Sequence, residues 1–92
     1  MLKGSATVLF NIIEGKYARL KGTDAYFPNR HRPKNVNEAC ELCEKILKHQ
    51  KSLTEEKLTS DEIDKIIEEG IRVVEKASSV LAEVETAKDF YN

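Results

Sequence analysis

The stretch that most constrains this chain is Thr59 to Asp89, which reads as one long amphipathic helix. Its apolar residues recur at spacings of three and four, and a strand is excluded because no alternation of period two runs through it. Thr59 and Glu62 have the spacing of a capping box, and Leu58 and Ile63 are placed to close a hydrophobic staple. At a rise of 1.5 Å per residue such a helix is about 45 Å long. We expect part of its apolar face to be completed by a second copy, because no other predicted element is as long.

Gly70 and Ala77 lie near the middle of this apolar face, seven residues apart. A glycine inside a helix costs roughly 1 kcal/mol relative to alanine. We therefore expect another helix to approach closely at Gly70, although a tolerated surface glycine is the alternative. The predicted interface of the self-associated protein comprises five positions: Val8, Ile12, Gly70, Ala77 and Val84.

The N-terminal segment predicts a helix over residues 2–21, with Gly22 as its C-terminal stop. Residues 7–13 would also suit a buried strand, but a lone strand has no pairing partner in an otherwise helical chain. Val8 and Ile12 lie off the main apolar face of this helix. They either widen its contact with the core or mark a second interface.

A third helix is predicted over residues 36–51, with Asn35 and Glu38 arranged as a capping box. Cys40 and Cys43 lie on its apolar face, where core cysteines are the simplest interpretation. A redox site would need a preceding strand, and a zinc site would need two further ligands at a matching spacing. His49 lies near the helix end, where it can interact with free carbonyl groups. We expect no metal and no cofactor.

These three helices predict an all-α fold, a small antiparallel helical bundle that forms a single domain over residues 1–92. Such a short chain has a marginal core, and self-association is a common remedy. A homodimer is the simplest closed oligomer for this chain, and a ring-shaped oligomer is the alternative.

Residues 22–35 form a long basic connection between the first two helices, with two prolines, a glycine and two asparagines. Guanidinium groups, helix N-termini and aromatic faces can all contact a phosphate-bearing ligand. The candidate ligand-binding residues are Tyr26, Phe27, Arg30, His31, Arg32, Lys34 and Arg19. The alternative is that the aromatic residues anchor the loop to the core while the basic residues are solvated or paired with the acidic helices.

Charge is distributed unevenly along the chain. Residues 1–34 hold seven Lys and Arg and two Asp and Glu, a net charge of +5, and the remaining residues hold eight and fourteen, a net charge of −6; together these give the overall −1. Such asymmetry suits an anionic ligand, or head-to-tail attraction between the two halves. No secretory signal or stretch of about 20 apolar residues is evident, so we expect a cytoplasmic protein without a membrane span.

No pattern in the sequence supports catalysis. Neither histidine has a nucleophile at motif spacing, and adjacent glutamates such as Glu68 and Glu69 point in divergent directions on a helix. The sequence therefore favours a small non-enzymatic oligomeric helical protein that acts as a protein–protein interaction or regulatory module, such as an inhibitor or adaptor. The alternative function is binding of a nucleotide or nucleic acid through the basic aromatic loop at residues 26–34.

Overall fold

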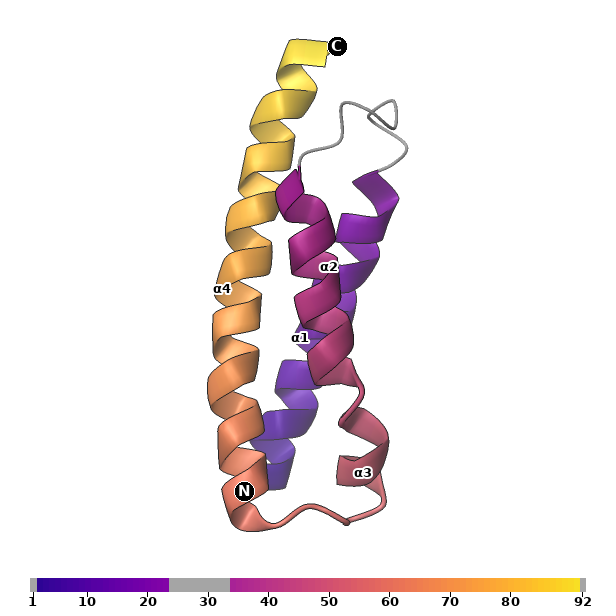
Figure 1. The fold of residues 1–92 in the computed structure, drawn as a ribbon, viewed down its shortest axis with the longest axis vertical. Helices are drawn as coiled ribbons and strands as arrows, with labels where there is room; N and C mark the ends of the chain where they lie inside the picture. Colours follow the sequence, from indigo (N-terminus) through magenta and orange to yellow (C-terminus); the bar gives the residue numbers. More distant parts are fainter. Residues whose placement is uncertain (1, 24–33, 92) are drawn as a thin grey trace.

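The computed structural model describes residues 2–23 and 34–91, with side chains described over 4–23 and 34–86. It is a small all-α helical bundle, as predicted, and the described residues contain no strand. The helices are α1 (Leu2–Gly22), α2 (Lys34–Leu47), α3 (Gln50–Thr54) and α4 (Ser60–Tyr91). Figure 1 shows α1 and α4 running in the same direction, with α2 returning antiparallel to both. This is the up-down-up arrangement that the connections predict.

The N-terminus of α4 is fixed by the predicted capping box. The Thr59 N–H donates to Glu62 Oε1 at 2.9 Å, and the Glu62 N–H donates to Thr59 Oγ1 at 3.2 Å. These hydrogen bonds to Thr59 hold the pKa of the Glu62 carboxyl below its usual range. Together they satisfy backbone donors at the point where the 32-residue helix begins.

The core lies along the shared axis of the three long helices and follows heptad-like spacing. Buried positions of α4 recur at alternating intervals of four and three residues from Ile66 to Val84. α1 and α2 present matching faces, which include Phe10 and Ile46. Among the described side chains, the buried apolar ones are Ala6, Phe10, Ile13, Leu20, Val36, Ala39, Cys43, Ile46, Leu53, Ile66, Val73, Ala77, Val80 and Val84.

Gly70 is buried where α1 crosses close to α4, which confirms the close approach predicted from the sequence. A Cβ atom built at this position would lie 3.0 Å from Leu9 Cγ, closer still to Leu9 Cδ2, and 3.5 Å from Ile13 Cδ1. The absence of a side chain at Gly70 is therefore what lets Leu9 pack against the α4 backbone.

The prediction of one helix over residues 36–51 is wrong about both ends of the helix. It begins at Lys34, so Asn35 lies inside the helix instead of capping it. The Asn35 side-chain amide donates to Glu83 of α4 at 3.1 Å, and Glu38 pairs with Lys76 of α4 at 4.0 Å. Both side chains of the expected capping box thus face the neighbouring helix.

At its C-terminus the predicted helix is divided into α2 and the five-residue α3. His49 lies at this break, where its N–H donates to the Ile46 carbonyl at 3.0 Å. Two residues after the end of α3, Glu56 lies in the left-handed region, at φ 57°, and the Lys57 N–H donates to the Ser52 carbonyl at 2.9 Å. Glycine usually fills such a position, so the sequence lacks the usual signal for this helix end.

None of the described helices has the length and apolar character that a membrane crossing requires.

Candidate functional site

The structure describes only part of the basic loop that was predicted to bind a phosphate-bearing ligand. Five of its seven candidate residues lie outside the described residues: Tyr26, Phe27, Arg30, His31 and Arg32. Lys34 is exposed at the first residue of α2, and Arg19 is exposed in the last turns of α1. No contact among the described residues links Arg19 and Lys34.

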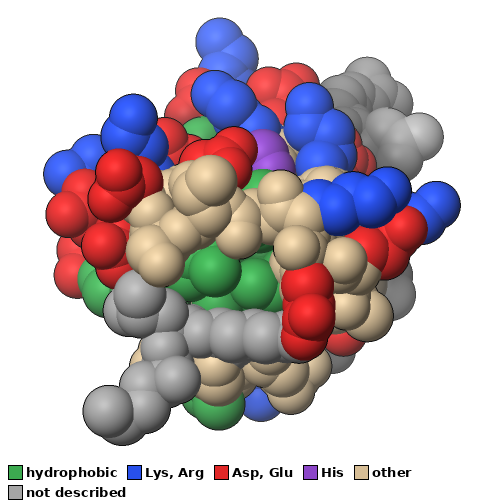
Figure 2. All heavy atoms as spheres, turned by 90° about the horizontal axis from the view of Figure 1, so that it is seen from below, with side chains coloured by type: hydrophobic (Ala, Val, Ile, Leu, Met, Phe, Trp, Pro, Cys, Tyr) green, Lys and Arg blue, Asp and Glu red, His purple; other side chains and the backbone are tan. Residues whose placement is uncertain are grey.

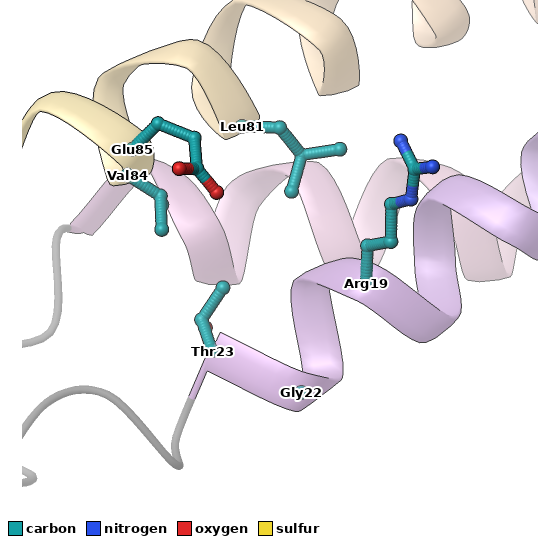
Figure 3. A pocket seen from close by; sticks show the side chains of 6 residues that line it. All are labelled: Arg19, Gly22, Thr23, Leu81, Val84 and Glu85. Carbon is teal, nitrogen blue, oxygen red and sulfur yellow. The ribbon is translucent and has the colours of Figure 1, made fainter. Parts of the chain in front are cut away.

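Arg19 borders a pocket of about 330 Å³ between the end of α1 and α4 (Figure 3). Leu81 and Val84 supply its apolar wall, and the buried Thr23 hydroxyl donates to the Leu20 carbonyl at 2.7 Å. Glu85 lines the same pocket, and Figure 3 shows its carboxylate pointing from α4 toward α1. Because Arg19 and Glu85 both line the pocket, it is mixed in charge, and its geometry does not select an anion.

The predicted interface residues divide into two groups. Gly70, Ala77 and Val84 are buried inside a single chain, where α1 and α2 cover them. Val8 is 59% exposed and Ile12 is 43% exposed on α1. A second copy could therefore reach Val8 and Ile12 without rearrangement of the bundle.

Val8 and Ile12 lie one turn apart on the outer face of α1. Gly4 and Gly15 flank them on the same helix, and a Cβ atom added at either glycine would meet nothing within 4 Å. A shallow hollow of about 210 Å³ continues from Ile12 along the helix and is lined by Asn11, Ile12, Gly15, Lys16 and Arg19. This outer face of α1 is low in relief and open to another helix, and it is apolar at Val8 and Ile12 and basic at Lys16 and Arg19.

A second surface is the groove between α2 and α4, which sequence reasoning missed. Its apolar floor is formed by Ile46 and Val73, with Leu42 at 37% exposure. The volume is about 310 Å³, and the charged rim consists of Lys45, Arg72, Lys76 and Glu69. Leu42 precedes the buried Cys43 by one residue, so it lies off the face of α2 that packs in the core. An apolar residue outside the core face was the sequence signal that could have indicated this groove.

Ile71 is the remaining large hydrophobic residue that is substantially exposed in the described part of α4, at 48%. Glu68 and Glu75 lie three residues before it and four residues after it, so all three share one face of the helix. Both glutamates are exposed. Ile71 is therefore an apolar knob with acidic neighbours.

The two cysteines behave as core residues. Cys43 is fully buried, and burial, followed by the nearby Cys40 and Glu44, raises the pKa of its thiol to about 11. Cys40 is half-buried. No group of three or more potential ligands that could hold a metal ion occurs among the described residues. A thiol that stays protonated is a poor nucleophile, which agrees with the structural interpretation of Cys43.

A polar contact on the other side of the bundle joins α1 to α2. The Tyr17 hydroxyl donates to Glu44 Oε1 at 2.5 Å, and this hydrogen bond raises the pKa of Tyr17 to about 12. The Lys21 Nζ atom lies 5.1 Å from the centroid of the Tyr17 ring, within the range of a cation–π contact. Tyr17 is held between these groups and has a structural role in packing the two helices.

The end of the bundle where α1 and α4 begin is apolar at its centre. Figure 2 shows hydrophobic side chains there, with acidic and basic side chains around them. A small hollow of about 200 Å³ is lined by His49, Leu58, Glu62, Lys65, Ile66 and Glu69. Its lining combines two glutamates with one lysine and one histidine, so it does not select one class of ligand.

Comparisons with protein-family models, with curated proteins and with solved structures found no match to this chain. The structure defines the chain as a small all-α helical bundle, and its surfaces are the basis for proposing a function.

Proposed function

We propose that this chain is a small non-enzymatic oligomeric protein that acts as a protein–protein interaction module of the regulatory or adaptor kind. The observation that carries the proposal is the distribution of exposed apolar side chains. Among the side chains that the structure describes, four large hydrophobic residues on three faces of the bundle are more than a third exposed: Val8, Ile12, Leu42 and Ile71. Single exposed hydrophobic residues are ordinary, but patches that continue into grooves are typical of interaction sites.

The outer face of α1 is the proposed surface for a protein partner. Val8 and Ile12 supply neighbouring apolar anchors, and the open glycines beside them let a partner helix lie close to the α1 backbone. Lys16 and Arg19 extend this face with positive charge. A partner with an apolar ridge and acidic flanks would match it best.

Photo-crosslinking in cells that naturally express the protein tests this surface. A photoreactive residue at Ile12 should give a discrete adduct, whereas one at Thr86, an exposed polar position on α4, should not. Val8→Glu should reduce the Ile12 adduct about 30-fold, the effect of losing a hot spot worth about 2 kcal/mol. Equal adducts at both positions, or an Ile12 adduct unaffected by Val8→Glu, would contradict the proposal.

Binding of a phosphate-bearing ligand through residues 26–34 is the second candidate function. Arg19 favours it, because its guanidinium borders the pocket beside the end of α1. We rank it second because Glu85 lines the same pocket. The absorbance ratio at 260 and 280 nm of the purified protein discriminates the two functions, since this chain has no tryptophan and three tyrosines.

A further inference from the structure

We propose that copies of this chain associate head to tail, with the Ile71 knob of one copy seated in the Leu42 groove between α2 and α4 of the next. This inference rests on the oligomeric part of the proposed function and names the two surfaces that meet. The knob is Ile71 with Glu68 and Glu75, and the groove is the cavity of about 310 Å³ whose floor is formed by Leu42, Ile46 and Val73.

The charges of the two surfaces are complementary. The groove rim has three cations, Lys45, Arg72 and Lys76, against one anion, Glu69, a net charge of +2. Lys76 also lies 4.0 Å from Glu38, which leaves Lys45 and Arg72 as the main cations for a docked acid. Opposite charges around a small apolar contact set its register and speed its formation.

The knob has the opposite sign. Glu68 and Glu75 lie beside Ile71, and Asp64 continues the same helix face seven residues before it. Arg72 and Lys76 follow Ile71 by one and five residues, so they project from other faces of α4. α4 is thus acidic around its exposed isoleucine and basic along its border with α2.

The lengths also match. The groove is lined by residues 42–46 of α2 and residues 69–76 of α4, so its α4 side spans about 12 Å at 1.5 Å per residue. The knob segment of α4 from Glu68 to Glu75 covers the same distance. A ridge of side chains packed into a groove between two helices is the usual geometry of helix association.

Knob and groove lie on different faces, so the contact is heterologous and each copy keeps one unused surface. The assembly therefore either closes into a ring or extends. Because each copy carries both surfaces, mixing two variants that each lack one surface distinguishes a head-to-tail contact from a two-fold dimer. A variant that lacks the knob still has a groove, and a variant that lacks the groove still has a knob.

Light scattering after size exclusion measures the mass of the full chain over a range of concentrations. The wild-type protein should exceed the single-chain mass of 10.5 kDa. Ile71→Glu and Leu42→Glu should each give the single-chain mass alone, and an equimolar mixture should give a two-chain complex. Ala18→Glu introduces a carboxylate at an exposed apolar position of α1 outside both surfaces and should leave assembly intact.

Leu42 is only partly exposed, so Lys45→Glu with Arg72→Glu serves as a second groove variant, and circular dichroism checks the fold of each. A wild-type protein that stays at one chain up to about 1 mM overturns both the contact and the oligomeric part of the proposed function. If the wild-type protein assembles but the mixture of variants does not, or the single variants still assemble, only the head-to-tail contact is overturned. The crosslinking test at Ile12 is independent of either result.

Discussion

The contacts that α4 makes with α1 and with α2 differ in chemistry. Toward α1 the contact is apolar and close, with Leu9 packed over the bare backbone of Gly70 and Ile13 beside it. Toward α2 the edge of the contact is polar, with the Asn35–Glu83 hydrogen bond at 3.1 Å and the Lys76–Glu38 pair at 4.0 Å. Dense packing gives stability, whereas an exposed ion pair contributes at most about 1 kcal/mol. The comparison teaches that the α1 side holds the fold together, while the α2 side leaves a groove available for binding.

The largest difference between the two sides should come from removing a large hydrophobic side chain from each. Ile13→Ala, at a fully buried position beside Gly70, should lower the free energy of unfolding by about 2–5 kcal/mol. Leu42→Ala, at a position 37% exposed in the groove, should cost about 1 kcal/mol or less. Urea unfolding followed by circular dichroism at one low protein concentration measures both. Equal losses would mean that the two sides of α4 contribute alike.

The next effect concerns the close contact itself. Gly70→Ala gains up to about 1 kcal/mol of helix propensity, but the new methyl group collides with Leu9, and overpacking costs about 1–3 kcal/mol. We expect a net loss of about 1 kcal/mol. In a Leu9→Ala background the same change should become neutral or stabilising, with a coupling of about 1–2 kcal/mol.

Gly15→Ala is the matched control for this cycle, because it lies inside α1 and has nothing within 4 Å of the added methyl group. It should stabilise the protein by up to about 1 kcal/mol. The close contact would be refuted if Gly70→Ala stabilised the wild-type protein as much as Gly15→Ala does.

The smallest effect should be a pH dependence at the start of α4, which neither side of the helix contains. Glu62 has a pKa below its ordinary value in the folded protein because it accepts hydrogen bonds at Thr59. A lowered folded-state pKa means that the capping contribution is present above the ordinary value of about 4.3 and is lost as the pH falls through the folded pKa.

Thermal unfolding at pH 6 and pH 3 of the wild-type protein and of Glu62→Gln measures this contribution. The wild-type protein should unfold at a higher temperature than the variant at pH 6, and the difference should shrink at pH 3. A difference that is equal at both pH values would show that ionisation of Glu62 does not stabilise α4.

The helical class and the start of α4 could be predicted because both depend on local sequence. The spacing of apolar residues and the Thr59–Glu62 pair are visible without knowledge of any neighbour. The break between α2 and α3 was missed because neither proline nor glycine marks it at Lys48 and His49. The end of α3 was missed because Glu56 takes the left-handed conformation that glycine usually marks. Asn35 was misjudged because its partner, Glu83, lies 48 residues away in the sequence.

The candidate surfaces were predictable to a smaller extent. Val8 and Ile12 were identified because they depart from the apolar period of α1. The groove at Leu42 requires two helices in a known register, and a sequence pattern does not give that register. Burial of Gly70 and Ala77 within one chain likewise depends on which helix lies against α4, and seven-residue spacing does not specify this.

The space left by the missing side chain at Gly70 also limits how α1 can shift along the axis of α4. Parallel helices with regular heptad faces can pack almost equally well after a shift of one turn, about 5.4 Å. In this bundle such a shift would move Leu9 away from the glycine and toward the side chains of Ile66 or Val74, where the same close approach is blocked. Gly70 therefore sets the axial position of α1 relative to α4. It thereby also sets the position of Val8 and Ile12 along the bundle axis.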